Sequence, residues 1–289
     1  MSILEAGNLR ALQHALRDQL QAIYPEAEAN AMAQELLLHV LSVSKTQLSL
    51  RWHEPVPQQA REQLQLLLPR LLQHEPLQYV LGKAYFYGME FSVSPAVLIP
   101  RPETEELVDL IIKQNQSKKN LHILDIGTGS GCIPVALAAH LQTEKVYAVD
   151  VSGEALAVAQ QNALNHQQKI EFIQADILRD EIPIANNSLD ILVSNPPYVL
   201  DGEQPQMRKN VLAHEPHLAL FVPNHNPLLF YTKIAELGQK LLKMSGKLYF
   251  EINEQFGQQT VKMLEQLAYR EVELLQDMFG KDRIVIAEK

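Results

Sequence analysis

Apolar residues recur at intervals of three and four through the first 75 residues, which is the spacing of one face of an α-helix. The first run ends before Pro25, because proline disfavours helical geometry in the preceding residue. Its apolar positions are Leu9, Leu12, Leu16, Leu20 and Ile23. Two further runs span 26–43 and 58–73, and Pro69 inside the later run predicts a kink or an early stop. Too few heptads are sustained for a coiled coil, so the pattern predicts a small helical bundle over residues 1–75.

Between residues 76 and 100 the pattern changes, and aromatic and β-branched residues are mixed with Gly and Pro. This mixture is typical of a short pair of strands with a connecting loop, so we expect a hairpin-like linker there. A helical pattern resumes at Pro102 and runs to about Gln114. Acidic residues directly after Pro102 interact favourably with the helix dipole at the N-terminal end of this helix.

Further along the chain, short apolar runs alternate with helical patterns, which indicates a parallel sheet covered by helices on both faces. Strands are expected at 122–126, 145–150, 170–176, 190–194, 246–252, 271–277 and 283–287. Helices are expected at 133–140, 153–165, 227–243 and 255–268, with a short helical piece near 177–180. Only residues 278–282 separate the last two strands, so the seventh strand is expected to run antiparallel at the edge of the sheet. We therefore predict an α/β domain over residues 101–289.

Composition and charge fit a chain of two globular parts. Of 289 residues, 46% are hydrophobic and 20% are charged, which supplies a core and excludes wholesale disorder. The 25 Lys and Arg against 34 Asp and Glu give a net charge of −9, which argues against a surface for non-specific binding of DNA or RNA. The single cysteine, Cys132, excludes an internal disulfide, and the opening segment lacks a signal-peptide pattern. No apolar run is long enough to cross a membrane, so we expect a cytoplasmic protein.

The strongest local signal is a glycine-rich segment, 127–131, which follows a predicted strand and opens a predicted helix. Glycines let the backbone turn tightly and approach a ligand closely, while free N–H groups at the helix start attract an anion. Asp150 ends the next strand, where a carboxylate binds the two hydroxyls of a ribose. A glycine turn used only for packing is the alternative, and the presence of Asp150 makes it the weaker one.

The spacing of the glycines distinguishes between nucleoside cofactors. A dinucleotide fingerprint would need its third Gly at Cys132, so a nicotinamide cofactor is the weaker interpretation. The segment 125–131 instead resembles the first motif of S-adenosylmethionine-dependent methyltransferases with a seven-stranded, Rossmann-like sheet. The resemblance implies S-adenosyl-L-methionine as the cofactor and S-adenosyl-L-homocysteine as the product. It places the methionine moiety against Gly127, Thr128, Gly129, Ser130 and Gly131, the ribose on Asp150, and the adenine beside Asp176 and Ile177.

Asp176 has a second interpretation, as the N-cap of the short helical piece that follows it, and the sequence leaves both open.

A second candidate site follows the next parallel strand, in the run Asn195-Pro196-Pro197-Tyr198. The carboxyl end of a parallel strand is where such sheets place ligands. The prolines leave backbone carbonyls free, Asn195 adds a side-chain carbonyl, and Tyr198 adds a flat ring. A planar NH2 group fits this corner, because it would donate to Asn195 and to the Pro196 carbonyl while Tyr198 stacks on it. We assign all four residues to acceptor binding, Asn195, Pro196 and Tyr198 to catalysis, and Asn195 to the cofactor site as well.

The run 195–198 resembles the acceptor motif of methyltransferases that act on planar nitrogens of adenine, guanine or glutamine. The stretches 75–82, 86–108, 214–221 and the closing residues extend the likeness, and together they resemble the HemK/PrmC family. The resemblance implies methylation of the glutamine amide in the Gly-Gly-Gln motif of class 1 peptide-chain release factors. It also implies a helical domain that grips this protein substrate, and residues 101–105 at the border of the cofactor pocket. Pro134, the stretch 222–228 and Asn253 depart from the family pattern.

Other functions remain open from the sequence. The same chemistry would act on a ribosomal protein in a sister family with the same acceptor motif. Methylation of a nucleic-acid base would require extruding the base, and the acidic net charge counts against it. A non-catalytic cofactor-binding protein is disfavoured because donor and acceptor motifs are both complete. The ten histidines lack the spacing of metal ligands, so we expect no metal. We also expect no direct nucleic-acid partner and a monomer.

Overall fold

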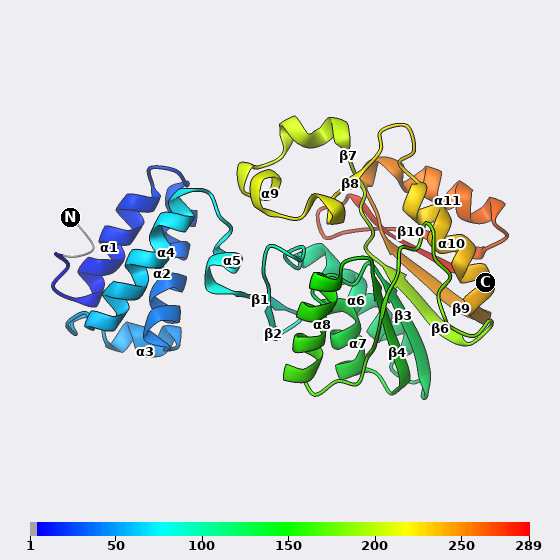
Figure 1. The fold of residues 1–289 in the computed structure, drawn as a ribbon, viewed down its shortest axis with the longest axis horizontal. Coiled ribbons are helices and arrows are strands. Elements are labelled where there is room, and N and C mark those ends of the chain that lie inside the picture. The colour runs from blue at the N-terminus through cyan, green and yellow to red at the C-terminus, as the bar shows by residue number, and fades with distance from the viewer. Residues whose placement is uncertain (1–4) are drawn as a thin grey trace. The chain divides into compact units, whose positions relative to one another are not determined.

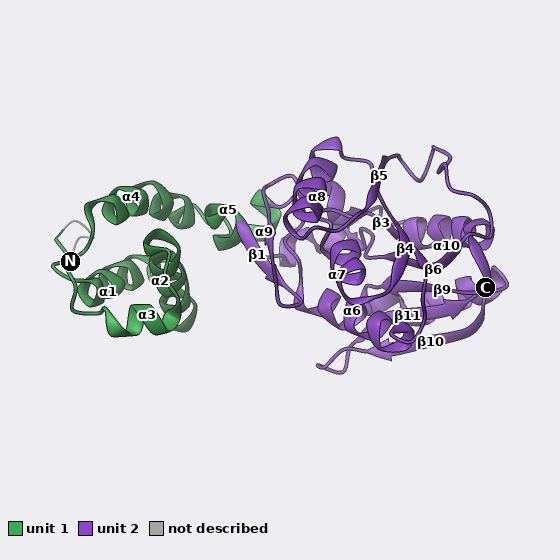
Figure 2. Ribbon diagram, turned by 90° about the horizontal axis from the view of Figure 1, so that it is seen from below, with its two compact units in different colours: residues 1–82, 209–214 green, residues 83–208, 215–289 purple. Residues whose placement is uncertain are grey.

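The computed structural model describes residues 5–289, which form two compact units (Figure 2). One unit contains the chain up to Gly82 together with Lys209–His214, and the other contains Lys83–Arg208 and Glu215–Lys289. Residues 1–4, with which the predicted helical bundle begins, lie outside the described residues. The domain limits expected from the sequence stay a prediction.

The helical unit, green in Figure 2, consists of helices that are labelled in Figure 1: α1 (Leu9–Leu20), α2 (Glu26–Leu41), α3 (Lys45–Leu50), α4 (Gln58–Leu72), α5 (Leu77–Leu81) and α9 (Lys209–His214). The apolar faces of α1, α2 and α4 form one buried core, which confirms the predicted bundle. The helix α4 continues past Pro69 to Leu72, so the predicted early stop does not occur. Burial of Leu68 and Leu71 on either side of the proline stabilises this last turn. The helix α3 was not predicted, because six residues are too few to show a helical period.

An antiparallel hairpin of β1 (Lys83–Phe86) and β2 (Met89–Ser92) opens the second unit, which confirms the predicted strand pair. Its turn residues Tyr87 and Gly88 have φ angles of 48° and 74°, the left-handed pair that suits a two-residue hairpin turn. The residues before the hairpin form α5 rather than the expected loop. Pro76 starts this helix and Gly82, with a φ of 72°, ends it.

The second unit is built on a seven-stranded sheet with the order β10-β11-β9-β6-β3-β4-β5. Its strands are β3 (Leu121–Ile126), β4 (Thr143–Asp150), β5 (Glu171–Gln174), β6 (Leu189–Ser194), β9 (Leu242–Glu251), β10 (Arg270–Gln276) and β11 (Asp282–Glu288). Six strands share one direction and β11 is antiparallel to both of its neighbours, as predicted. The predicted position of this strand at the edge is wrong, because β11 lies between β9 and β10. A short loop dictates the direction of a strand but not its lateral order in the sheet.

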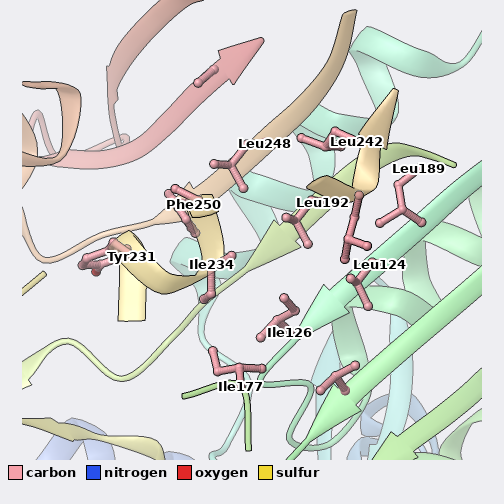
Figure 3. Close-up of a cluster of buried hydrophobic side chains, with 14 of the residues drawn as sticks. Leu124, Ile126, Ile177, Leu189, Leu192, Tyr231, Ile234, Leu242, Leu248 and Phe250 are labelled. Carbon is pink, nitrogen blue, oxygen red and sulfur yellow. The ribbon is translucent and has the colours of Figure 1, made fainter. Parts of the chain in front are cut away.

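Helices cover both faces of this sheet. On β3, Leu124 and Ile126 belong to the core of one face, and Leu121 and Ile123 to the core of the other. The first face is covered by α10 (Leu229–Leu241) and α11 (Gly257–Gln266), and the second by α6 (Pro102–Asn115), α7 (Cys132–His140) and α8 (Gly153–Asn165). Figure 3 shows the first core, in which Ile234 of α10 packs with the residues of the strands. Burial on both faces explains the nearly continuous apolar runs of the central strands.

The chain between β6 and α10 carries elements that the sequence pattern did not predict. They are the strands β7 (Val199–Leu200) and β8 (Phe221–Val222), the 3-10 turns η1 (Asp201–Gln206) and η2 (His217–Ala219), and the helix α9. The two short strands pair with each other in parallel. Within this segment between β6 and α10, Lys209–His214 belongs to the helical unit, and the chain on both sides of it belongs to the second unit. Among residues 5–289, none of the helices has both the length and the apolar character that crossing a membrane requires.

Candidate active site

The glycine-rich turn leads from β3 into α7 along a path that other residues adopt only with strain. The φ angles of Gly127, Gly129 and Gly131 are 75°, 54° and 77°, in the left-handed region that favours glycine. At Gly131 a Cβ would lie only 3.0 Å from the Cβ of Ala159 on α8, so close packing also requires glycine there. The N–H of Gly127 donates to the carbonyl of Val149 on β4 at 2.8 Å. The neighbouring strand therefore holds the turn in place.

Asp150, at the end of β4, is joined to this turn. Its Oδ2 accepts from the N–H of Gly129 at 2.9 Å, and its Oδ1 accepts from the N–H of Ser152 at 2.9 Å. Burial raises the pKa of this carboxyl, and the backbone donors of Ser152 and Gly129 oppose the increase. Because two backbone donors fix the carboxylate, it presents the same acceptor geometry to any ligand beside it.

A cavity of about 240 Å³ lies at the carboxyl ends of β3, β4 and β6. Its lining includes eight residues expected from the sequence: Gly127, Gly129, Asp150, Asp176, Ile177, Asn195, Pro196 and Pro197. Ala96, Val97 and Leu98 line it as well, and so do Pro216, Leu218 and Ala219. The structure thus brings the glycine turn and the Asn-Pro-Pro corner to one cavity, although about 65 residues of sequence lie between them.

Thr128, Ser130 and Gly131, which the resemblance placed against the methionine moiety, do not line this cavity. Thr128 and Ser130 are buried on the inner side of the turn. The carbonyl of Ser130 accepts from the side-chain amide of the fully buried Asn162 on α8 at 2.9 Å. These residues therefore pack on the buried side of the turn, away from the cavity.

Two polar side chains below the turn lack partners. Asp125 and Thr128 are both buried. Among the described residues, no hydrogen-bond partner reaches either carboxylate oxygen of Asp125 or the hydroxyl of Thr128. Burial raises the pKa of Asp125 to about 7, and the charge of Asp150 adds to the increase. The nearby Thr128 hydroxyl opposes it without meeting hydrogen-bond geometry. An unpaired buried carboxylate is costly, so a cationic ligand next to the turn would relieve it.

Asp176 borders the cavity and also holds its own backbone turn. Its Oδ1 accepts from the N–H of Leu178 at 3.0 Å, and its Oδ2 lies 3.4 Å from the guanidinium of Arg179. The chain at 177–180 forms turns, so the predicted short helix is wrong, and Asp176 caps a turn instead of a helix. A single capped turn satisfies the polar pattern that had suggested a helix. Ile177 packs in the core of the first sheet face (Figure 3) and reaches the cavity.

Asn195 directly follows β6 and forms the acceptor corner with Pro196 and Pro197. Its Nδ2 donates to the hydroxyl of Thr104 on α6 at 3.1 Å. Its Oδ1 has no hydrogen-bond partner among the described residues. The preceding Ser194 donates to the carbonyl of Ile126 at 2.6 Å, which ties the end of β6 to the end of β3. Asn195 therefore lines the cavity with its NH2 group hydrogen-bonded to Thr104 and its carbonyl oxygen unpaired.

Tyr198 is placed differently from what the sequence suggested. It does not line this cavity, and its hydroxyl donates to Oε1 of Glu251 on β9 at 3.2 Å. Burial, followed by the nearby Glu251 charge, raises the pKa of Tyr198 above its ordinary range. Tyr198 instead borders a second cavity of about 290 Å³ together with Glu203, Asn253 and Arg283. Its predicted stacking on an acceptor stays a prediction.

Glu251 is a functional candidate that the sequence did not predict, and Thr104 was expected only as part of the stretch 101–105 at the border of the cofactor pocket. Thr104 is 3% exposed and donates to Oε2 of Glu251 at 2.6 Å. Glu251 is the last residue of a parallel strand, the position at which such sheets place functional groups, and this signal could have found it. None of residues 101–105 lines the cavity, but Thr104 reaches it through Asn195.

A buried ion pair joins two segments that border the cavity. Arg101 contacts Oε1 of Glu215 at 2.6 Å, and the Glu215 side chain is 1% exposed. The N–H of Ile99 approaches Oε2 of the same carboxylate at 3.4 Å. The stretch 96–101 and the stretch 215–219 are therefore tied together, and both contribute residues to the lining of the cavity.

Two of the residues that depart from the family pattern fit the structure. Pro134 is the third residue of α7, within the first turn, where no backbone donor is needed. Asn253 opens the 3-10 turn η3 (Glu254–Phe256), since its Oδ1 accepts from the N–H of Gln255 at 3.0 Å. Its Nδ2 donates to the carbonyl of Tyr198 at 3.1 Å. Asn253 thereby fastens the chain after the acceptor corner. No group of three or more possible metal ligands occurs within 5–289.

Comparison with known proteins shows the family of the chain. Residues 104–218 match the model of the methyltransferase small domain, and residues 11–82 match that of the PrmC N-terminal domain. The release factor glutamine methyltransferase of Bacteroides thetaiotaomicron is 45% identical over 274 residues, which are 95% of this chain and 98% of that protein. The chain belongs to the HemK/PrmC family.

A second member of the HemK/PrmC family, the release factor glutamine methyltransferase of Flavobacterium psychrophilum, is 50% identical over 226 residues, or 77% of this chain and 79% of that protein. Among solved structures, a methyltransferase from Pyrococcus furiosus has the same fold, with a TM-score of 0.52 and 18% identity over 76% of this chain and 96% of that chain. The membership confirms the predicted family, and the shared fold confirms the predicted Rossmann-like methyltransferase sheet.

Proposed function

We propose that this chain transfers a methyl group from S-adenosyl-L-methionine to the side-chain amide nitrogen of the glutamine in the Gly-Gly-Gln motif of class 1 release factors. The observation that carries the proposal is the Oδ1 of Asn195, which stands without a partner beside the cavity that the glycine turn and Asp150 border. Its support from the family is that the relatives of Bacteroides and Flavobacterium carry this activity in their names.

The residues around the cavity fit this cofactor. Asp125 and Thr128 lie behind the glycine turn and do not line the cavity, but their unpaired carboxylate and hydroxyl would favour the ammonium group of its methionine part next to the turn. The Asp150 carboxylate lines the cavity and suits ribose hydroxyls. Asp176 and Ile177 would flank the adenine, with the apolar side chain packed on the ring. When bound, S-adenosylmethionine supplies an electrophilic methyl carbon on a positively charged sulfur. The glycine turn would hold the cofactor without side chains in the way.

The acceptor corner would hold the glutamine amide by both of its hydrogens. One N–H donates to Asn195 Oδ1 and the other to the carbonyl of Pro196, which the proline rings keep rigid. An amide nitrogen is a weak nucleophile because its lone pair is delocalised, so orientation is the main contribution of the protein. Held by both oxygens, the nitrogen would be aimed at the methyl group that the bound cofactor supplies, and the proton that it gives up would pass to water. No metal and no strong base is required.

A protein acceptor is favoured over a nucleic-acid base. The net charge of −9 opposes binding of a polyanion, and the unit that matches the PrmC N-terminal domain supplies a separate surface for a protein substrate. A ribosomal protein stays the second candidate acceptor, because the corner recognises only the planar amide. We further propose that the enzyme acts as a monomer in the cytoplasm, where release factors act in translation.

The test is methyl transfer from labelled S-adenosylmethionine to a purified class 1 release factor. We expect label on the glutamine of the Gly-Gly-Gln peptide, located by mass spectrometry, and none on a release factor whose motif ends in Ala. Purified ribosomes and tRNA serve as competing acceptors. Label on ribosomal protein or RNA, with none on the release factor, would contradict the proposal.

A further inference from the structure

Three side chains from distant parts of the sequence form a continuous chain of hydrogen bonds behind the acceptor corner. Asn195 Nδ2 donates to Thr104 Oγ1 at 3.1 Å, and the Thr104 hydroxyl donates to Glu251 Oε2 at 2.6 Å. Thr104 and Glu251 are 3% and 1% exposed, so water has little access to either. The chain therefore runs from the cavity into the interior of the domain.

The direction of these hydrogen bonds follows from the carboxylate at the inner end. An ionised carboxylate only accepts, so the single hydroxyl proton of Thr104 must point to Glu251. The Thr104 oxygen is then left only with lone pairs, and it selects the NH2 end of the Asn195 amide. The carbonyl end of Asn195 is thereby turned away from Thr104. Without this chain, the two ends of the Asn195 amide would be similar in size and free to exchange places.

We propose that Thr104 and Glu251 are positioning residues that set the polarity of the Asn195 amide, so that its oxygen and not its NH2 group meets the acceptor. This inference rests on the proposed function, because it matters only if the acceptor donates hydrogens. It also assigns the corner a specificity: an acceptor with an NH2 group is accepted, and a carboxylate of the same shape is rejected. Thr104 and Glu251 act through Asn195 and need not touch the substrate.

The charge of Glu251 adds to the effect. The acceptor nitrogen gains positive charge as the new bond forms, and a carboxylate connected through two hydrogen bonds makes the Asn195 oxygen a stronger acceptor at that moment. Other groups also face Glu251: Tyr198 donates to its second oxygen, Arg283 on β11 attracts its charge, and Glu103 on α6 repels it. The charge of Glu251 also acts on Tyr231 of α10.

The pH dependence of turnover provides one readout. Burial raises the pKa of Glu251 above its ordinary value of 4.5, while Thr104 and Arg283 oppose the increase. Protonation would remove the preference for a donating Thr104, so kcat at saturating cofactor is expected to fall as the pH drops through this raised pKa. Glu251→Gln keeps the shape of the side chain and is expected to abolish this acid limb.

The decisive experiment compares Thr104→Val, which keeps the shape but removes the hydroxyl, with Thr104→Ser, which keeps the hydroxyl. The full chain and an intact release factor are used. We expect Thr104→Val to lower kcat about 10- to 100-fold, and Thr104→Ser to stay within about threefold of the natural chain. Thr260→Val is the matched control, because the buried Thr260 hydroxyl on α11 donates to the carbonyl of Phe256, four residues before it, and not to a member of the Asn195–Thr104–Glu251 chain.

Two measurements separate positioning from a loss of folding. Calorimetric affinity for S-adenosylhomocysteine is expected to stay within about threefold in all variants. A release factor whose motif reads Gly-Gly-Glu is expected to compete poorly against the natural chain and about tenfold better against Thr104→Val, because the freed Asn195 NH2 can then meet the carboxylate. NMR exchange of the Asn195 side-chain hydrogens is expected to accelerate in Thr104→Val only.

The outcomes also separate this inference from the proposed function. If the natural chain methylates release factors and Thr104→Val retains full kcat and full discrimination against the Glu acceptor, the inference is wrong and the proposed function stands. If the natural chain does not methylate release factors, the proposed function itself fails. Equal losses in Thr104→Val and Thr260→Val would assign Thr104 to stability alone and overturn the inference.

Discussion

The two sides of the cavity are built in different ways. On the cofactor side, the Gly127–Gly129–Gly131 turn is a continuous stretch, and Asp150 reaches it by one hydrogen bond from the adjacent strand. On the acceptor side, Thr104, Asn195 and Glu251 come from a helix, a loop and a strand that are far apart in sequence. The cofactor side depends on backbone geometry, and the acceptor side depends on a network of side chains. Substitutions on the two sides should therefore damage different steps.

The largest effect is expected on the acceptor side, from Asn195→Ala. Removing the amide oxygen leaves one hydrogen of the acceptor unpaired and its nitrogen free to turn, so kcat is expected to fall by about a thousandfold. The affinity for S-adenosylhomocysteine should stay within about threefold, because the turn and Asp150 are untouched. Single-turnover kinetics and calorimetry on the same preparation check both halves. Normal turnover in this variant would refute the amide clamp.

Asp150→Ala should have the opposite profile. The loss of a charged acceptor for two ribose hydroxyls is expected to weaken cofactor affinity by about 10- to 100-fold. It also removes the acceptor of the Gly129 N–H, so the turn itself loosens. At saturating S-adenosylmethionine, kcat should recover to within about tenfold of the natural chain. An unchanged Kd, measured by titration calorimetry, would exclude Asp150 from the cofactor site.

A smaller effect is expected from Asp125→Asn, in the stability of the cofactor-free protein. The pKa of Asp125 is raised from 3.8 to about 7 in the folded chain, so its favourable contribution is present below pH 3.8 and is lost as the pH rises through 7. The substitution should therefore raise the free energy of unfolding at pH 8 by up to about 4 kcal/mol and flatten its decline between pH 4 and 7. Urea denaturation across this range measures it.

The affinity of Asp125→Asn for S-adenosylhomocysteine provides a second test of the cofactor side. Because the Asp125 carboxylate is proposed to meet a cationic group, Asp125→Asn should weaken S-adenosylhomocysteine binding even though it stabilises the free chain. Binding to the natural chain near pH 7 should release protons, which calorimetry in buffers of different ionisation enthalpy detects. A variant that is both more stable and equally tight in binding would exclude Asp125 from ligand recognition.

The sequence predicted the parts of this molecule that depend on local patterns. Short-range periodicity located the helices around Leu9–Leu20 and Gly153–Asn165, and the glycine spacing identified the turn beside the cavity. The lateral place of β11 was missed, because the lengths of connections say nothing about which neighbours a strand pairs with. The roles of Thr104 and Glu251 were missed for the same reason, since their contact joins residues 147 positions apart. Long-range packing creates these relations, and no local pattern records it.

The most direct measurement is a crystal structure of the chain with S-adenosylhomocysteine and a release factor. We expect the glutamine amide nitrogen to lie within about 3 Å of both Asn195 Oδ1 and the carbonyl of Pro196, with the sulfur of the product cofactor on the opposite side of the nitrogen from the glutamine chain. A glutamine nitrogen more than about 4 Å from both oxygens, or a cofactor bound outside the cavity at Gly127 and Asp150, would contradict it.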